Sequence, residues 1–322
     1  MATVTSTETQ PRTSAQRPRR WRREKYNRKE SLAGLLFIAP WIVGFSVFTV
    51  ISMTWSLRLS FSDYDLATNS GAPVGLDNYR LLFEDPKVLT SLGNTFFYTL
   101  LAVPLEMVVA LGLASLLASV RRGAGVFRTV FYLPKMTPVV ATAAVFLLLL
   151  NGNSGAINSF LGLFGIPGPQ WLTDPAWVKP AIVVMSLWTV AGSMVILLAA
   201  LQNVPRELYE AAETDGASRT RQFFSITMPL ISPTLFFLTI VNTIAALQVF
   251  DQAFLLFYRD GTSSAPDAAL FYGVYLFQQA FRQFNFGLAA AMAWLLFVII
   301  LGITALQITI GNRLVHYEGG NR

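Results

Sequence analysis

Long apolar runs separated by short polar segments dominate the chain. Six of these runs are long enough to cross a bilayer core, which needs about 20 mainly apolar residues per helix. Several runs contain proline, which bundled helices tolerate because neighbouring helices satisfy the backbone groups that proline frees. The pattern therefore predicts an all-α integral membrane protein with six transmembrane helices. The predicted helices cover residues 32–57, 94–118, 129–151, 181–201, 231–257 and 287–310.

The predicted membrane domain covers residues 31–312, and a polar segment precedes it and another follows it in the chain. Residues 1–30 are rich in Arg and lack an apolar pattern, so we expect a disordered basic arm. Residues 313–322 form a short polar tail. The pair Arg19-Arg20 also occurs in twin-arginine signals, but no A-x-A cleavage site follows the first apolar run. A retained first helix is therefore favoured over a cleaved signal.

Composition agrees with a membrane protein. The chain has 322 residues, of which 53% are hydrophobic and 13% are charged, whereas soluble domains carry roughly 25% charged residues. Nine basic and three acidic residues fall within residues 1–30, so this segment accounts for the whole net charge of +6. A basic segment beside a hydrophobic helix favours a topology signal and contact with anionic lipid over nucleic-acid binding.

The distribution of Lys and Arg predicts the orientation of the helices. Seventeen basic residues lie on the side of the termini, and six lie on the opposite side. Because basic residues gather in cytoplasmic loops, we expect both termini and the loop 202–229 to be cytoplasmic.

Several kinds of chemistry are excluded by the residues that the chain lacks. It has no Cys and a single His, His316, in the polar tail, so thiolate chemistry and His-based metal clusters are ruled out. No H-E-x-x-H or G-x-S-x-G motif occurs, which argues against the alternative of an intramembrane enzyme. A G-x-x-x-x-G-K-[ST] motif is also missing, so any use of ATP requires a separate ATPase. We predict no catalytic residue and no metal site.

The loop 202–229 has the start and stop signals of two short helices. Pro205 precedes "RELYEAAET", and Gly216 is suited to the left-handed position after it. Ser218 is a candidate cap for "RTRQFFSIT", a helix that we expect to end before Pro229. Periodicity alone favours an amphipathic loop lying on the headgroups, and a docking element for another protein is the alternative.

Residue identities in this loop favour the docking element. The loop contains Glu210, Ala211 and Ala212, then three residues, Gly216, nine further residues, and Ile226 followed by "TMP". This pattern closely resembles the EAA loop of bacterial ABC-importer permeases. The resemblance implies that the loop seats in a cleft of an ATPase subunit and transmits its closure to the membrane helices. The residues to which it assigns this coupling are Glu210, Ala211, Ala212, Asp215, Gly216, Phe223, Phe224, Ile226 and Pro229.

The resemblance extends over nearly the whole chain after residue 32. "FIAPWIVGFSVFTVISMTWSLRLSFSDYD", "YLPKMTP" and "QVFDQAFLLF" follow one another as in the maltose and glycerol-3-phosphate type of carbohydrate-uptake permeases. This implies a six-helix permease bundle with a cytoplasmic EAA loop in the bacterial cytoplasmic membrane. The implied partners are a second related permease, two ATPase subunits, an extracytoplasmic solute-binding protein, a sugar and membrane lipid, without nucleic acid. ATP and Mg²⁺ would bind to the ATPases, and this chain would bind no cofactor.

Polar residues in the fourth and fifth spans are candidates for the solute path, because polar side chains at the bilayer midplane are costly. Hydrogen bonds within the helix bundle explain such hydroxyls equally well. On the fifth span, helical spacing places Gln248 and Asp251 close together around the axis. Asn242 is turned away from both. The full set of candidates is Ser186, Thr189, Ser193, Asn242, Gln248 and Asp251.

Lys135 is the one cation well inside a predicted span. Its side chain can extend back to the headgroups, and attraction of an anion is the alternative. A membrane scaffold or ion channel without ATPase coupling also fits six spans, but it would not need two docking helices.

Overall fold

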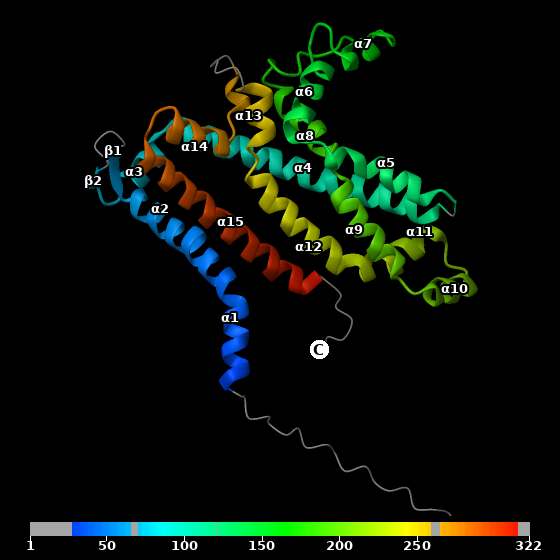
Figure 1. Ribbon diagram of the computed structural model, residues 1–322. Helices are drawn as coiled ribbons and strands as arrows, with labels where there is room; N and C mark the ends of the chain where they lie inside the picture. Colours follow the sequence, from blue (N-terminus) through cyan, green and yellow to red (C-terminus); the bar gives the residue numbers. More distant parts are fainter. Residues whose placement is uncertain (1–27, 66–69, 121, 259–264, 315–322) are drawn as a thin grey trace, which may run out of the picture. The chain divides into compact units, whose positions relative to one another are not determined.

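The computed structural model describes residues 28–65, 70–120, 122–258 and 265–314 (Figure 1). The chain divides into two compact units, residues 1–54 and residues 55–322. Most of the predicted basic arm and of the predicted polar tail, including His316, falls outside the described residues.

Within the described residues, four helices are long and apolar enough to cross a membrane. They are Leu32–Ser60, Pro86–Ser119, Arg219–Phe257, which is interrupted at residues 248–250, and Phe286–Gly311. Two helix pairs also qualify but are sharply bent: α5 (Ala124–Met136) with α6 (Val139–Leu149), by 95°, and α8 (Val178–Leu187) with α9 (Ala191–Gln202), by 48°. The number of spans is therefore four, or up to six if each bent pair is one span.

Each bend has a local cause in the sequence. Thr137 precedes Pro138, and a residue before proline is pushed out of the helical conformation; Thr137 is accordingly extended, with φ −75° and ψ 131°. At the second bend, the hydroxyl of Ser186 donates to the carbonyl of Val183, and that of Thr189 donates to the carbonyl of Ser186. Such side-chain bonds to the preceding turn bend helices.

The first unit is helical over its described residues. Helix α1 (Arg28–Phe45) contains Pro40 and continues into the π-helical turn η1 (Ser46–Ile51) and the start of α2 (Ser52–Ser60). Its apolar side chains are largely exposed; Phe37, for example, is 87% exposed. Such a surface is suited to lipid or to another membrane chain.

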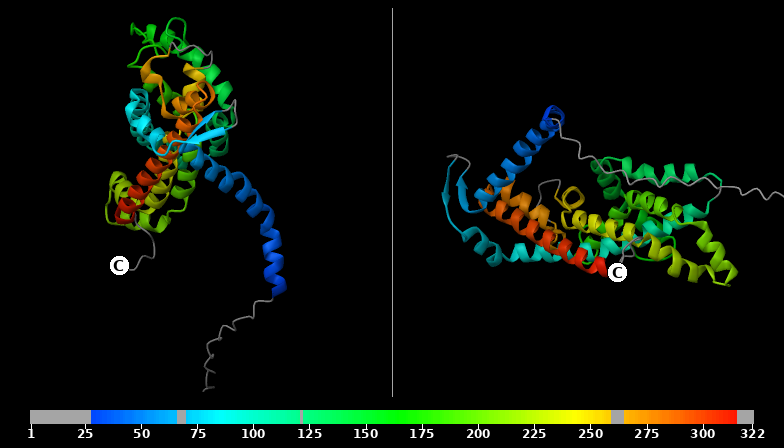
Figure 2. Two further views of the ribbon diagram at one scale, coloured as in Figure 1. Left: turned by 90° about the vertical axis from the view of Figure 1, so that its left-hand side faces the viewer. Right: turned by 90° about the horizontal axis from the view of Figure 1, so that it is seen from below.

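Helix α4 (Pro86–Ser119) is the centre of the second unit. It begins where the side chain of Asp85 accepts a hydrogen bond from the backbone N–H of Lys87, at 2.9 Å, with proline at the first helical position. It packs along α9 and along α12 (Met228–Leu247) (Figure 2). Buried alanines of α4, such as Ala110 and Ala114, let the neighbouring helices approach closely.

A cap of short elements covers the start of α4. The elements α3 (Asp77–Glu84), η3 (Asp267–Ala269) and α14 (Tyr272–Phe281) pack against α4, and α15 (Phe286–Leu314) begins after α14. Two further short helices lie elsewhere, since α13 (Asp251–Phe257) packs against α6 and α8, and α7 (Ala156–Gly162) packs against α6. Strands β1 (Ser62–Asp65) and β2 (Ser70–Pro73) form a small antiparallel hairpin, with Ser62 opposite Pro73. This hairpin departs from the predicted all-α fold, although helices make up most of the described chain.

Buried side chains fix the segment around η3 to α4. The side-chain amide of Asn94 donates to the carbonyls of Asp267 and Leu270, at 2.8 and 2.9 Å, and the hydroxyl of Thr95 accepts from the backbone N–H of Tyr272. On α14, the hydroxyl of Tyr275 donates to the carboxylate of Asp85. Burial, together with this carboxylate, raises the pKa of Tyr275 to about 12.

Candidate functional site

The loop after α9 forms a helix–turn–helix element, residues 206–227. Its first helix, α10 (Arg206–Thr214), follows Pro205 and ends in a turn where Gly216 has φ +73°. The N–H of Gly216 donates to the carbonyl of Glu213 at 3.0 Å, and the N–H of Ala217 donates to that of Ala212 at 2.9 Å. The predicted first helix and the left-handed glycine are therefore confirmed.

The second half of the element consists of α11 (Arg219–Gln222) and the π-helical turn η2 (Phe223–Thr227). As predicted, the side chain of Ser218 caps α11, accepting from the N–H of Arg221 at 3.4 Å. The expectation that this helix ends before Pro229 was wrong, because residues 219–247 are continuously helical. The π turn, in which the N–H of Met228 bonds to the carbonyl of Phe223, widens the backbone where proline has no N–H to give.

One hydrogen bond ties the two halves of the element together. The hydroxyls of Tyr209 on α10 and Thr227 at the end of η2 lie 2.7 Å apart. The side-chain amide of Gln222 also donates to the carbonyl of Ala217 at 3.0 Å, which fixes α11 to the turn. These bonds hold α10, α11 and η2 together.

The predicted coupling residues all lie on this element or directly after it. Phe224 is 64% exposed, and its ring meets that of Phe223 edge-on, with centroids 5.2 Å apart. The element therefore combines an exposed aromatic ring with exposed carboxylates. Exposed members of the predicted set are Glu210, Ala211, Asp215, Gly216 and Phe224, and half-buried members are Ala212, Phe223, Ile226 and Pro229.

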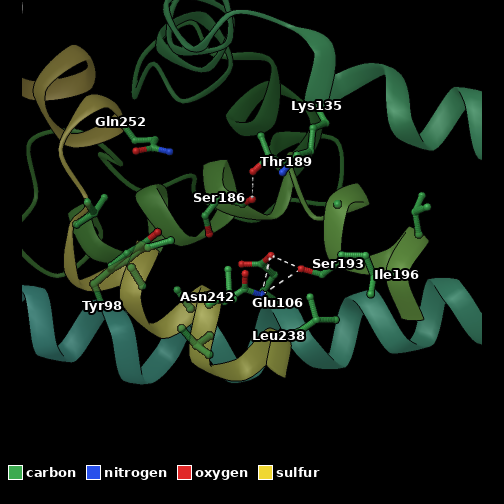
Figure 3. Close-up of a pocket in the computed structure, with 18 of the residues that line it drawn as sticks. Tyr98, Glu106, Lys135, Ser186, Thr189, Ser193, Ile196, Leu238, Asn242 and Gln252 are labelled. Carbon is green, nitrogen blue, oxygen red and sulfur yellow. Dashed lines mark hydrogen bonds between the residues drawn. The ribbon is translucent and has the colours of Figure 1, made fainter. Parts of the chain in front are cut away.

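A central cavity of about 470 Å³ lies between α4, α5, α8, α9 and α12 (Figure 3). Glu106 on α4 lies 20 residues into a helix of 34 residues, so the cavity is near the middle of that span. Side chains with hydroxyl, amide and charged groups share its wall with apolar ones. The polar residues of the lining are Tyr98, Glu106, Tyr132, Lys135, Ser186, Thr189, Ser193, Asn242 and Gln252.

Three of these polar residues form a hydrogen-bonded cluster that joins three helices. Ser193 on α9 donates to Oε1 of Glu106 at 3.0 Å, and the side-chain amide of Asn242 on α12 donates to the same oxygen at 3.3 Å. Asn242 also donates to the hydroxyl of Ser193 at 3.1 Å. The cluster places a hydrogen-bonded carboxyl group on the cavity wall.

The structure brings four of the six predicted path residues together in this cavity: Ser186, Thr189, Ser193 and Asn242. Gln248 and Asp251 are exposed and are not part of its lining, which includes Gln252. The helical spacing that grouped them does not apply, because the helix stops at Leu247 and α13 restarts at Asp251. Contact of any of the six with a solute stays a prediction.

Glu106 was not among the site residues predicted from the sequence. A carboxylate in the interior of an apolar run is itself a signal, since ionisable residues within spans usually face a water-filled cavity or a partner. Its position in the predicted span 94–118 was therefore sufficient to mark it as a candidate. Its partners Ser193 and Asn242 are 87 and 136 residues away in the chain, so only the fold identifies them.

Within the part of the chain that the structure describes, no group of three His, Cys, Asp or Glu side chains is arranged to hold a metal ion. The central cavity and the helix–turn–helix element are joined by one helix instead, because residues 219–247 run from α11 to beyond Asn242.

Comparison with known families identifies this architecture. The family described as "Binding-protein-dependent transport system inner membrane component" matches residues 106–315. The chain belongs to this family. The family is one of transporter permeases rather than enzymes, and the predicted resemblance to ABC-importer permeases of the carbohydrate-uptake type is confirmed.

Curated relatives cover nearly the whole chain. The probable ABC transporter permease protein YesP of Bacillus subtilis is 41% identical over 90% of this chain and 94% of the relative. The lactose transport system permease protein LacF of Rhizobium radiobacter is 33% identical over 88% of this chain and 96% of the relative. The alignments cover 94% and 96% of these two permease proteins, so this permease is similar to them over nearly their whole length.

A solved structure shows the same fold. One chain of a bacterial alginate ABC transporter, crystallised with an alginate pentasaccharide-bound periplasmic protein, superimposes with a TM-score of 0.79. The match covers 89% of this permease and 96% of that chain, at 23% sequence identity. At this identity the similarity shows the fold alone.

Proposed function

We propose that this permease forms half of the membrane path of an ATP-driven importer for a carbohydrate, an oligosaccharide or a sugar derivative. The other half is a second, related permease. Two ATPase subunits bind ATP and Mg²⁺, and an extracytoplasmic solute-binding protein delivers the sugar. This chain binds no cofactor of its own, because its role is to form the path and to move.

The carbohydrate class is supported by the relatives. LacF is named for lactose transport. The structural neighbour is a chain of an alginate ABC transporter, whose periplasmic protein holds an alginate pentasaccharide. The cavity agrees with this class, because its hydroxyl and amide groups are donors and acceptors suited to sugar hydroxyls. Such groups orient a solute within a largely apolar wall.

The orientation follows from the basic residues. With both termini in the cytoplasm of the bacterial cell, the helix–turn–helix element faces the ATPases, and the cap around α3 and α14 faces the solute-binding protein. The charge bias of 17 basic residues against six supports this arrangement.

The continuous helix between element and cavity is the observation that carries the proposed mechanism. Gln222 in the element and Asn242 in the cavity are 20 residues apart in one helical segment, or about 30 Å at 1.5 Å per residue. Because the bond between Tyr209 and Thr227 joins α10 to this helix, movement of the docked element tilts the helix. Tilting displaces Asn242, and with it the bond to Glu106, so the cavity opens to the other side.

The ATPase contact is tested by reversing one exposed charge on the element. In Glu210→Lys we expect the ATPase to co-purify with the permease pair at much lower yield in mild detergent. Asp77→Lys is the matched control, since Asp77 is equally exposed in the first turn of α3, on the opposite side of the proposed membrane. Equal recovery of the ATPase with both variants would contradict the assignment of the element.

A further inference from the structure

Lys135 is the single basic residue in the lining of the central cavity. It lies in the last turn of α5, close to the bend, and its side chain reaches toward Thr189 (Figure 3). Among the described residues, Lys135 makes no hydrogen bond and has no acidic partner within 4 Å. The cavity therefore contains an ammonium group whose donors are free.

The position of this ammonium group depends on a glycine. A Cβ atom at Gly192 on α9 would lie 2.7 Å from Nζ of Lys135 and 3.1 Å from its Cε. Any larger residue would displace the side chain. Gly192 thus leaves the space in which the end of Lys135 lies against α9, beside Ser193.

Glu106 is the acidic residue of the same lining, and it does not neutralise Lys135 by direct contact. One of its oxygens accepts from Ser193 and Asn242, which orients the carboxyl group toward α9 and α12. Glu106 and Lys135 therefore interact electrostatically across the cavity without forming a direct ion pair. An incoming group meets an ammonium that is free to donate and a carboxyl group that already has partners.

A second hollow also carries excess positive charge. It has a volume of about 280 Å³ and lies at the start of α4, where Lys87 and Arg282 face it together with one acidic residue, Asp267. Lys87 is 19 residues from Glu106, or about 28 Å along α4. Cations at the outer end of a path raise the local concentration of an anionic solute.

We propose that the transported sugar carries an oxyanion, a carboxylate or a phosphate, and that Lys135 binds this group in the central cavity. The inference rests on the proposed function and specifies its substrate class. An ammonium group forms stronger hydrogen bonds to an oxyanion than to a neutral hydroxyl, because charge-assisted bonds are roughly twice as strong. Gly192 leaves room for this ammonium group against α9.

The test is uptake into proteoliposomes that contain the complete transporter with its solute-binding protein. Three disaccharide probes are compared: one with a uronic acid, the same disaccharide with this carboxyl group reduced to an alcohol, and the reduced form carrying a phosphate. Wild-type transporter is expected to take up an anionic probe. Lys135→Met is expected to lower the uptake of that probe by about ten- to a hundred-fold, the effect of losing a hydrogen bond to a charged group.

Three further variants separate binding from folding. Lys135→Arg keeps the charge and should retain most of the uptake, whereas Gly192→Ala, which displaces the ammonium group, should lower it. Lys179→Met is the control, because Lys179 lies over the ring of Phe97, 4.8 Å from its centroid, and lines neither hollow. Its uptake should equal that of the wild type.

The outcomes distinguish this inference from the proposed function. Uptake of the neutral probe alone, or an equal loss of neutral and anionic uptake in Lys135→Met, overturns the role of Lys135 but leaves sugar import intact. Uptake of none of the probes by the wild type overturns both. A loss confined to the uronic acid or to the phosphate identifies which oxyanion the cavity binds.

Discussion

Replacement of Gly216 by alanine tests the helix–turn–helix element with a calculable perturbation. Gly216 has φ +73°, and no atom lies within 4 Å of where a Cβ would stand. The substitution therefore meets no steric clash, and its cost is that of the left-handed backbone alone, about 1–2 kcal/mol for a residue with a Cβ. An energy of this size shifts a local equilibrium by a factor of about 5 to 30. We expect the population of the dockable turn to fall by that factor.

The assay is the affinity of the ATPase for the permease pair in nanodiscs, measured with purified subunits. Gly216→Ala should raise the Kd by about 5- to 30-fold, while membrane insertion is unchanged. Gly216→Asn should have a smaller effect, because Asn tolerates the left-handed region better than Ala. Gly216→Pro should abolish uptake, because proline fixes φ near −65° and lacks the N–H that bonds to Glu213.

Gly165 supplies the matched control. It has φ +71° and equally open surroundings, but it follows α7 in the loop between α6 and α8, away from the element. Gly165→Ala therefore has the same backbone cost and should leave the affinity for the ATPase unchanged. An equal Kd for both alanine variants and the wild type would refute the coupling role of the turn.

Three further predictions follow from individual contacts. Ser193→Ala should lower sugar uptake about tenfold or more, because bonds to charged groups contribute about 1.5–3 kcal/mol, and Ser193→Thr should retain it; equal uptake by both would contradict a role for the bond to Glu106. Tyr209→Phe removes the bond to Thr227, worth about 1 kcal/mol, so hydrogen exchange of the amides in α10 should speed up about fivefold; unchanged exchange would show that the bond does not hold the element together. Burial stabilises the neutral form of Tyr275 and raises its pKa from about 10 in the unfolded chain to about 12 in the folded protein. The stabilisation is therefore complete below a pH of about 10 and is lost as pH rises through about 12. The melting temperature should decrease across this pH range, and it should decrease less in Tyr275→Phe.

Local features of the fold could be predicted from the sequence because they depend on neighbouring residues. The left-handed turn at Gly216 and the cap at Ser218 follow from glycine and serine chemistry within a few residues. The apolar runs likewise mark the spanning segments. The sharp bend at Thr137 is explained by Pro138, but its angle of 95° depends on packing against other helices.

Features that depend on contacts between distant residues could not be predicted from the sequence. The helical break after Leu247 has no proline to mark it, so a helical wheel grouped Gln248 with Asp251 and separated them from Asn242. The cluster around Glu106 joins three helices, and its members are scattered over the chain. A π turn before Pro229 also contradicts the rule that a helix ends ahead of proline, because the wider turn accommodates the ring.

The most direct test of the account is ATP-dependent uptake of a labelled oligosaccharide into proteoliposomes that contain this permease, its partner permease and the ATPases. We expect uptake only when two conditions are met together: ATP is present on the cytoplasmic side, and the sugar-loaded solute-binding protein is present on the other side. Sugar flux that proceeds without ATP would contradict it, and would show that the chain forms a passive path.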